Sequence, residues 1–147
     1  MELRRATASD AEKIAVLEAE CFPDAWEERD VLSCICSEGA MCFVAVRDGV
    51  TCGYILGRKI LPEGEIYRIA VKPDMRGRGI GYRLLSFALS TEWDDGVETT
   101  FLEVREQNIV ARRLYIAAGF EEISVRKNYY KNPTDNAIIM IKGLKCQ

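Results

Sequence analysis

Three predicted strands that follow one another directly constrain the fold of this chain more than any other feature. They cover residues 42–46, 50–60 and 65–71. Asp48-Gly49 between the first two is a two-residue hairpin signal, and the proline and glycine within 62–64 mark the next turn. Strands joined by such short turns pair antiparallel, so we expect a three-stranded meander in the middle of the chain.

The elements before the meander are a short strand and two helices. We expect the strand at residues 2–7, followed by a helix that starts at a capping box formed by Ser9 and Glu12. The segment Phe22–Trp26 interrupts this helix, because its proline lacks the N–H that would continue the hydrogen-bond ladder. A second helix is predicted over 27–37.

A glycine-rich segment follows the meander and opens a third helix, whose apolar stripe consists of Leu84, Leu85, Ala88 and Leu89. The later elements are a strand at 99–104, a helix from Asn108, and strands at 120–126 and 137–141. The whole order reads β-α-α-β-β-β-α-β-α-β-β. It predicts a single α+β domain over residues 1–147, with a mixed central sheet of about seven strands and flanking helices.

Composition narrows the chemistry that such a domain can perform. A formal net charge of −3 disfavours a strongly basic nucleic-acid binder. The chain contains no histidine, which excludes Ser-His-Asp and Cys-His catalysis as well as zinc sites that use histidine. Acid–base chemistry must therefore come from Glu, Asp, Tyr, Lys or Cys.

Most of the cysteines are better explained as small core residues than as ligands or disulfides. They are Cys21, Cys34, Cys36, Cys42, Cys52 and Cys146. The N-terminus has no apolar signal core, and no apolar run reaches the length of a membrane span. Cys34-Ile35-Cys36 lacks a second pair at zinc-ligand spacing. We therefore expect a cytoplasmic protein with reduced thiols, no metal and no membrane partner.

The glycine-rich segment Arg76-Gly77-Arg78-Gly79-Ile80-Gly81 is typical of an anion site, because glycines allow close backbone approach and the next helix points its N–H groups at the turn. Residues 68–83 contain five basic side chains and one acidic side chain. The P-loop and dinucleotide patterns both fail; Tyr82 stands where the latter needs glycine. On the turn alone, a polyanion site and a plain turn with solvated arginines are equally open.

This segment resembles the R/Q-x-x-G-x-G/A signature of the GNAT family of N-acetyltransferases, and the order of elements matches that family along the whole chain. Further segments resemble the RimI-type branch: Cys21–Pro23 with Trp26, Ile69–Pro73, Leu102–Arg105, Leu114-Tyr115 with Gly119-Phe120, Asn128–Tyr130 and Ala137–Met140. The resemblance implies an enzyme that moves the acetyl group of acetyl-CoA to the N-terminal alanine of a small-subunit ribosomal protein.

The resemblance also implies where acetyl-CoA binds. The glycine-rich turn would hold its pyrophosphate, and the preceding strand would pair with its pantetheine arm. The cofactor-binding residues implied are Ile69, Ala70, Val71, Arg76, Gly77, Arg78, Gly79, Ile80, Gly81, Tyr82 and Asn108. Asn108 is also a preferred helix N-cap residue, and the two roles are compatible.

Two residues are candidates for the proton transfers. Glu103 interrupts an apolar strand, and strand alternation places it on the face opposite Leu102 and Val104. The residues alone also allow a glutamate paired with an arginine; the resemblance implies a general base. Tyr115 follows Asn108 by nearly two helical turns and can donate a proton to a leaving thiolate. Packing alone would make it a core residue; the resemblance implies a general acid.

The acceptor site is the least defined part. Residues 128–136 read as a polar connection between the last two strands, which would line an acceptor groove together with the 22–26 loop or form an ordinary surface hairpin. Trp26 and Tyr130 are the expected acceptor contacts. Other candidate functions are acetyl transfer to a lysine or a small amine, and acyl-CoA binding without catalysis.

Overall fold

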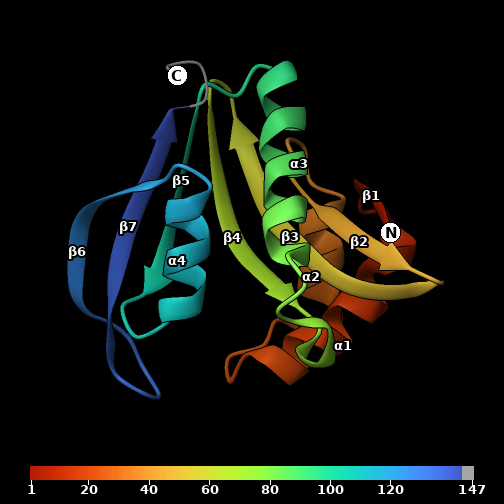
Figure 1. The fold of residues 1–147 in the computed structure, drawn as a ribbon, viewed down its shortest axis with the longest axis horizontal. Helices are drawn as coiled ribbons and strands as arrows, with labels where there is room; N and C mark the ends of the chain where they lie inside the picture. Colours follow the sequence, from red (N-terminus) through yellow and green to blue (C-terminus); the bar gives the residue numbers. More distant parts are fainter. Residues whose placement is uncertain (144–147) are drawn as a thin grey trace.

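A seven-stranded mixed sheet forms the centre of the computed structural model, which describes residues 1–143 (Figure 1). The strands are β1 (Glu2–Arg5), β2 (Phe43–Arg47), β3 (Val50–Ile60), β4 (Glu63–Val71), β5 (Thr99–Arg105), β6 (Glu121–Tyr130) and β7 (Asp135–Gly143). Their order is β1-β2-β3-β4-β5-β7-β6. Among the strands of residues 1–143, only the β4–β5 pair is parallel, so the predicted meander and the mixed sheet are both confirmed.

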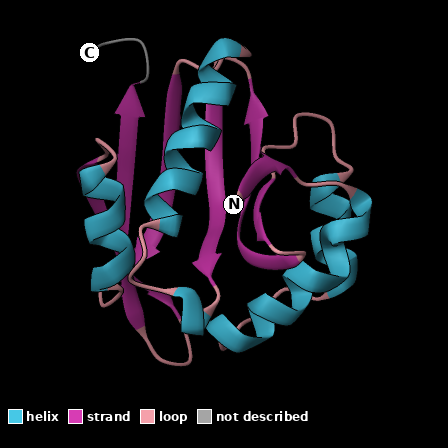
Figure 2. Cartoon of the chain, turned by 45° about the vertical axis from the view of Figure 1, so that its right-hand side comes forward, coloured by secondary structure: helices cyan, strands magenta, loops and turns pink. Residues whose placement is uncertain are grey.

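Helices cover the sheet on two sides (Figure 2). They are α1 (Ala11–Cys21), α2 (Glu28–Ile35), α3 (Ile80–Asp94) and α4 (Ile109–Ala117), with single 3-10 turns η1 (Ala8–Asp10) and η2 (Pro73–Met75). On one face, α3 and α4 bury the predicted stripe with Leu84 and Leu85 against Phe43 and Ile55. On the other face, α1 and α2 pack around Tyr54 over β2, β3 and β4. None of the helices within residues 1–143 is long and apolar enough to cross a membrane.

The helical segment that η1 and α1 form together is capped by a different residue from the one predicted. The N–H of Thr7 donates to Oδ2 of Asp10 at 2.7 Å, so the capping box is formed by Thr7 and Asp10 instead of Ser9 and Glu12. Arg4 of β1 donates to both oxygens of the same carboxylate at 2.8 and 3.0 Å. This ion pair favours the earlier cap, and β1 ends at Arg5, two residues before the predicted end.

Two predicted turns are shorter in the structure than the sequence pattern indicates. Glu63 and Gly64 pair with Ile60 and Lys59, so the turn between β3 and β4 is confined to residues 61–62. The connection expected over 128–136 is present but confined to residues 131–134, because β6 continues to Tyr130 and β7 starts at Asp135. A register shift between 126 and 130 absorbs the polar residues that interrupt the strand pattern.

The parallel strands β4 and β5 pair over only four residues each. The register runs from Glu63 with Thr99 to Ile66 with Leu102, and the strands then diverge (Figure 1). The divergence begins where the β3–β4 register shifts, between Leu56 and Gly57, leaving Tyr67 as the extra residue of a bulge. Because a bulge bends and twists its strand, it turns the C-terminal half of β4 away from β5.

The bulge requires a glycine on the facing strand. A Cβ atom at Gly57 would lie 2.4 Å from the carbonyl oxygen of Glu65 and 3.3 Å from Cα of Ile66. Both are backbone atoms, so no side-chain rotation can relieve the overlap. Any other residue at this position must push β3 and β4 apart.

We therefore predict that Gly57→Ala destabilises the fold by about 1–3 kcal/mol, as overpacking of a closely packed site does. Thermal unfolding measures this as a fall of roughly 2–4 °C per kcal/mol. Gly143→Ala is the matched control, since a Cβ there meets nothing within 4 Å. Equal melting temperatures for the two variants would contradict the role of Gly57.

Candidate active site

The divergence of β4 and β5 opens two adjoining cavities. The first, of about 460 Å³, lies beside the end of β4, the glycine-rich turn and α4. The second, of about 480 Å³, lies between the 22–26 loop, β4, β5 and the start of β7. Cys21, Phe22, Ile69, Asn108 and Ala111 line both, so the two cavities form one continuous cleft across the gap in the sheet.

The end of β4 presents a strand edge to this cleft. Ile69, Ala70 and Val71 all line the first cavity. They pair with β3 on one side, but the β4–β5 ladder has already ended at Ile66. This edge can therefore pair with an extended chain laid into the gap, as a sheet edge does when it binds a peptide.

The glycine-rich turn forms the far wall of the first cavity. Gly77 and Gly79 have φ angles of +80° and +78°, which favour glycine, and a Cβ at either position would meet nothing within 4 Å. Gly79 caps α3, and the first helical bond to it comes from Arg83 N–H at 3.1 Å. The N–H groups of Ile80, Gly81 and Tyr82 have no partner inside the helix, and these residues line the cavity.

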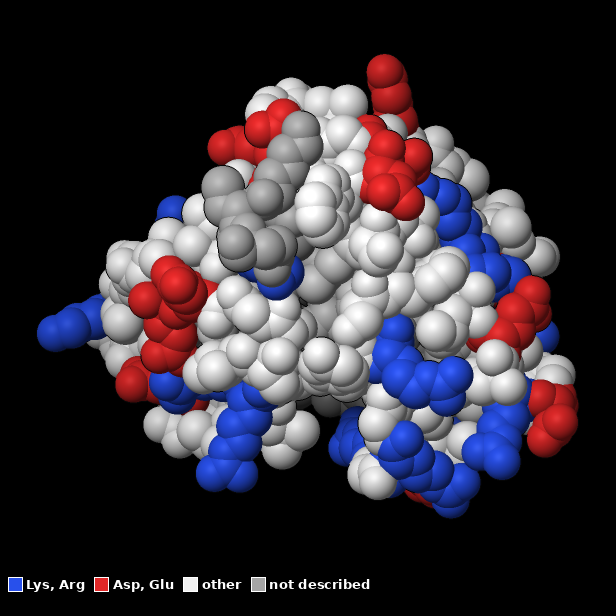
Figure 3. Space-filling model, turned by 45° about the horizontal axis from the view of Figure 1, so that its top comes forward, with Lys and Arg blue, Asp and Glu red and all other residues white. Residues whose placement is uncertain are grey.

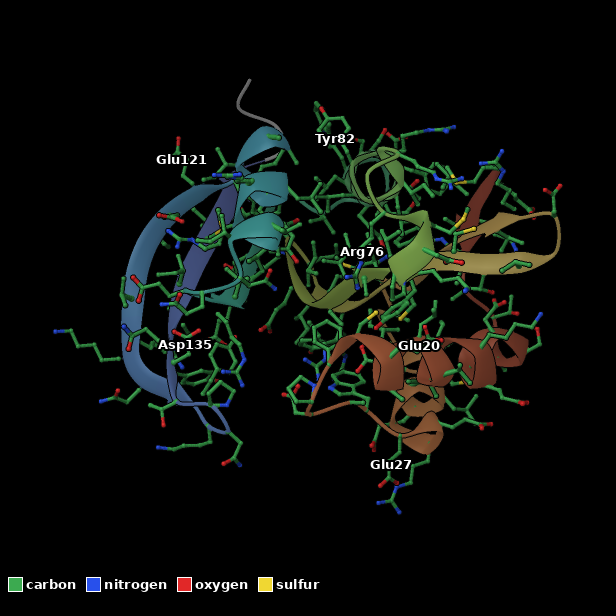
Figure 4. All side chains as sticks on the ribbon, turned by 60° about the horizontal axis from the view of Figure 1, so that its bottom comes forward. Glu20, Glu27, Arg76, Tyr82, Glu121 and Asp135 are labelled. Atoms are coloured by element: carbon green, nitrogen blue, oxygen red, sulfur yellow. The ribbon has the colours of Figure 1, made fainter. Side chains whose placement is uncertain are left out.

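The two arginines of the turn have different surroundings. Arg76 lines the first cavity, but its Nε donates to the carbonyl of Val71 at 3.0 Å and its Nη2 to Sγ of Cys21 at 3.3 Å. Figure 4 shows Arg76 between α1 and the start of α3. Arg78 is exposed and does not line the cavity. Arg76 thus holds α1 to β4, and Arg78 reaches into solvent beside the turn.

The local positive charge is smaller than the residue count indicates. Arg68 lies on the α1 side of β4, where its Nε is 3.4 Å from Glu18 and its Nη2 is 3.3 Å from Asp24. Lys72 pairs with Asp74 at 3.2 Å. Figure 3 shows several lysine and arginine side chains in the lower part of the face that it draws. The predicted attraction for a polyanion therefore depends on Arg78 and the backbone N–H groups more than on the full set of arginines.

Asn108 lies where the two cavities meet, a position that suits both roles predicted for it, the cap of α4 and a contact to the cofactor. Its side-chain oxygen accepts a hydrogen bond from Ala111 N–H at 3.2 Å, which confirms the predicted cap of α4. The same residue lines both cavities.

Glu103 faces the second cavity, and alternation along β5 buries Leu102 and Val104 on the opposite face as predicted. Its Oε1 accepts from Tyr129 Oη at 3.4 Å, and its Oε2 lies 3.5 Å from Nη1 of Arg126. The pairing with an arginine that the residues alone allowed is thus present, and the arginine is Arg126. Because the Arg126 side chain is 56% exposed, solvent screens this ion pair. Oε2 of Glu103 is buried and accepts no hydrogen bond, so the carboxylate keeps an acceptor that is not used within the described residues.

Tyr115 reaches the same cavity from the other layer of the protein. It is buried on α4, with its ring 5.6 Å from that of Phe120 in an edge-on arrangement. It packs in the core and also lines the cleft. Burial raises the pKa of the Tyr115 phenol above its usual range, so the hydroxyl stays protonated at neutral pH.

The two predicted acceptor residues are separated in the structure. Tyr130 lines the second cavity, and burial together with the negative charge of Glu103 raises its pKa to about 12. Trp26 does not line that cavity; its ring packs 6.0 Å from the ring of Tyr67. Sequence reasoning missed Tyr67 and Arg68 as lining residues, and only the register shift at the bulge places both of them on this side of β4.

The cysteines form no ligand set. Cys34 and Cys42 approach to 3.6 Å between Sγ atoms and are free thiols, while Cys146 lies outside the described residues. Within residues 1–143, no group of three or more Cys, Asp or Glu side chains is arranged to hold a metal ion.

Comparison with known proteins identifies related sequences and folds. Residues 11–120 match the acetyltransferase (GNAT) family. The chain is 34% identical to the ribosomal protein bS18-alanine N-acetyltransferase of Escherichia coli over 124 residues, which cover 83% of this chain and 82% of that protein. Identity to the Haemophilus influenzae protein of the same name is 40% over 91 residues, which span only 62% of that protein's length.

The fold is likewise similar to a solved structure. The crystal structure of the ribosomal-protein-S18-alanine N-acetyltransferase from Escherichia coli superimposes with a TM-score of 0.91 at 28% identity, covering 97% of this chain and 93% of that chain.

Proposed function

This chain belongs to the acetyltransferase (GNAT) family, and on that premise we propose that it transfers the acetyl group of acetyl-CoA to the N-terminal α-amine of a protein. The acceptor we propose is the N-terminal alanine of a small-subunit ribosomal protein, which the names of the Escherichia coli and Haemophilus influenzae relatives support. The observation that carries the proposal is the cleft in which the free edge of β4, Glu103 and Tyr115 meet. Such an enzyme would act in the cytoplasm, without a metal and without direct contact to nucleic acid.

The first cavity is suited to coenzyme A. Ile69, Ala70 and Val71 offer backbone groups to the amides of the pantetheine arm, in the manner of an added strand. The N-terminus of α3 offers three N–H groups and a positive dipole end to the pyrophosphate. Gly77 and Gly79 leave room for that approach, because no side chain covers the turn there.

The second cavity is suited to the transfer itself. A peptide α-amine has a pKa of about 7.7–8.0, so a modest base suffices to make it a nucleophile at neutral pH. Glu103 is the proposed base, acting directly or through a water molecule. Tyr115, protonated throughout the neutral range, is the proposed donor to the departing thiolate. Backbone N–H groups near Ile69–Val71 are the proposed donors to the oxygen that gains charge during attack.

Coenzyme A binding should depend on the phosphate contacts. Calorimetric titration should give a dissociation constant that rises with salt, and Arg78→Ala should raise it about 2–5-fold, as expected for an exposed charge near a helix terminus. Arg47→Ala, at the exposed end of β2, is the control. Pantetheine that binds as tightly as coenzyme A would contradict the pyrophosphate site.

The proton-transfer roles can be tested separately from binding. Glu103→Gln and Tyr115→Phe should each lower kcat about 100-fold or more, while the dissociation constant of coenzyme A stays within about 2-fold. Residual activity of Glu103→Gln should rise with pH through the α-amine pKa, because the neutral amine must then form without help. Glu12→Gln, on the exposed side of α1, should match the wild type. Undiminished kcat in either active-site variant would refute its role.

The acceptor class is tested with three substrates. Acetyl transfer followed by mass spectrometry should favour a peptide with a free N-terminal alanine over the same peptide with a blocked N-terminus and an internal lysine, and over a small amine. Preference for lysine or the small amine would assign another acceptor to the same chemistry. Coenzyme A binding without transfer to any of the three would leave a binding module instead.

A further inference from the structure

A buried cluster of charged groups lies beneath the 22–26 loop. Glu18 of α1 and Tyr54 of β3 are both 0% exposed, and the side chain of Arg68 on β4 is 14% exposed. We call these three residues the Glu18 cluster. A carboxylate at such depth is costly unless every oxygen finds a partner, so the contacts of Glu18 show what the cluster holds in place.

Glu18 ties together a strand and the loop. Its Oε2 accepts a hydrogen bond from the Tyr54 hydroxyl. Its Oε1 accepts from the backbone N–H of Trp26 at 2.9 Å and lies 3.4 Å from Nε of Arg68. The carboxylate therefore fixes the end of the loop that enters α2.

Arg68 holds the rest of the loop. Its Nη2 donates to the carbonyl oxygen of Asp24 at 2.7 Å and lies 3.3 Å from the Asp24 carboxylate. Its guanidinium carbon lies 4.4 Å from the ring centre of Phe22 and 5.8 Å from that of Trp26, within the range of cation–π attraction. One arginine thus contacts three positions of a segment that lies between two helices.

The position of Arg68 connects this loop to the reacting groups. It follows the bulge residue Tyr67 and directly precedes Ile69, which lines both cavities. Phe22, Pro23 and Asp24 line the second cavity together with Glu103 and Tyr130. The loop is therefore one wall of that cavity, and Arg68 joins this wall to the strand that forms its floor.

We propose that Arg68 and Glu18 are positioning residues that latch the 22–26 loop onto β4 and so set the acceptor side of the cleft. The proposal rests on the proposed function. Arg68 itself lines the second cavity, but its charge is already balanced by Glu18 and Asp24, so it acts on the acceptor through the loop and not by direct pairing. Loss of these contacts weakens the binding of a peptide acceptor and leaves the first cavity unchanged.

The test compares three kinetic constants in matched variants. Arg68→Met should raise the KM for an N-terminal alanine peptide about 10-fold, with kcat within about 3-fold and the dissociation constant of coenzyme A within about 2-fold. Arg68→Lys keeps a positive charge near Glu18 but loses the planar fork, and should raise this KM by an intermediate factor. Arg4→Met is the control. Arg4 of β1 also joins a strand to the start of α1, through the carboxylate of Asp10, but it does not line either cavity.

A small amine acceptor separates positioning from general damage. Alaninamide is too short to contact the 22–26 loop. The Arg68→Met variant should therefore acetylate it at a rate within about 2-fold of the wild-type rate. If Arg68→Met unfolds, the double variant Glu18→Gln with Arg68→Met removes the unpaired buried charge and is measured in its place.

The results distinguish a failure of the positioning role from a failure of the proposed function. An unchanged peptide KM, or equal losses with peptide and alaninamide, overturns the latch while the acetyltransferase proposal stands. A wild-type protein that binds coenzyme A but acetylates no amine overturns the proposed function, and the latch with it.

Discussion

The short parallel pairing of β4 with β5 is the constraint on which the rest of the structure depends. Four residues of each strand are paired, and then the bulge at Tyr67, facing Gly57, turns β4 aside. An intact ladder would leave no free strand edge and no cleft. Because the ladder stops at Ile66, the next residues of β4 keep their bonds to β3 and present their other edge to the gap.

The gap also allows the two proposed catalytic groups, which belong to opposite sides of the sheet, to meet at one site. Glu103 belongs to the face of β5 opposite the α3–α4 layer, whereas Tyr115 lies on α4 within that layer. In a continuous sheet the backbone would separate them. Both line the second cavity, because the sheet is open between β4 and β5 at this level. A chain without histidine can therefore bring a carboxylate and a phenol to one site from opposite sides of its sheet.

Two arginines flank the free edge of β4 and both point to α1. Arg68 holds the loop after α1, and Arg76 contacts the last residue of α1 and the carbonyl of Val71. Their hydrogen bonds make the wall of the cleft and the strand edge one connected unit. In the sequence the two residues belong to a cluster of basic side chains. In the structure they join α1 to β4, and the first backbone N–H groups of α3 remain as the proposed anion-binding groups.

The sequence by itself determined the order of elements, the meander, the glycine-rich turn before α3, the cap at Asn108 and the face of β5 to which Glu103 belongs. These follow from local rules: strand alternation, the conformational freedom of glycine and the hydrogen-bonding of an N-cap side chain. Only the tertiary structure decided the Thr7 cap, the extent of β6, the gap between β4 and β5 and the roles of Arg68 and Arg76. Each of these depends on a contact between different elements, such as Arg4 of β1 with Asp10 or Arg68 of β4 with Glu18 of α1, and no local pattern records which elements meet.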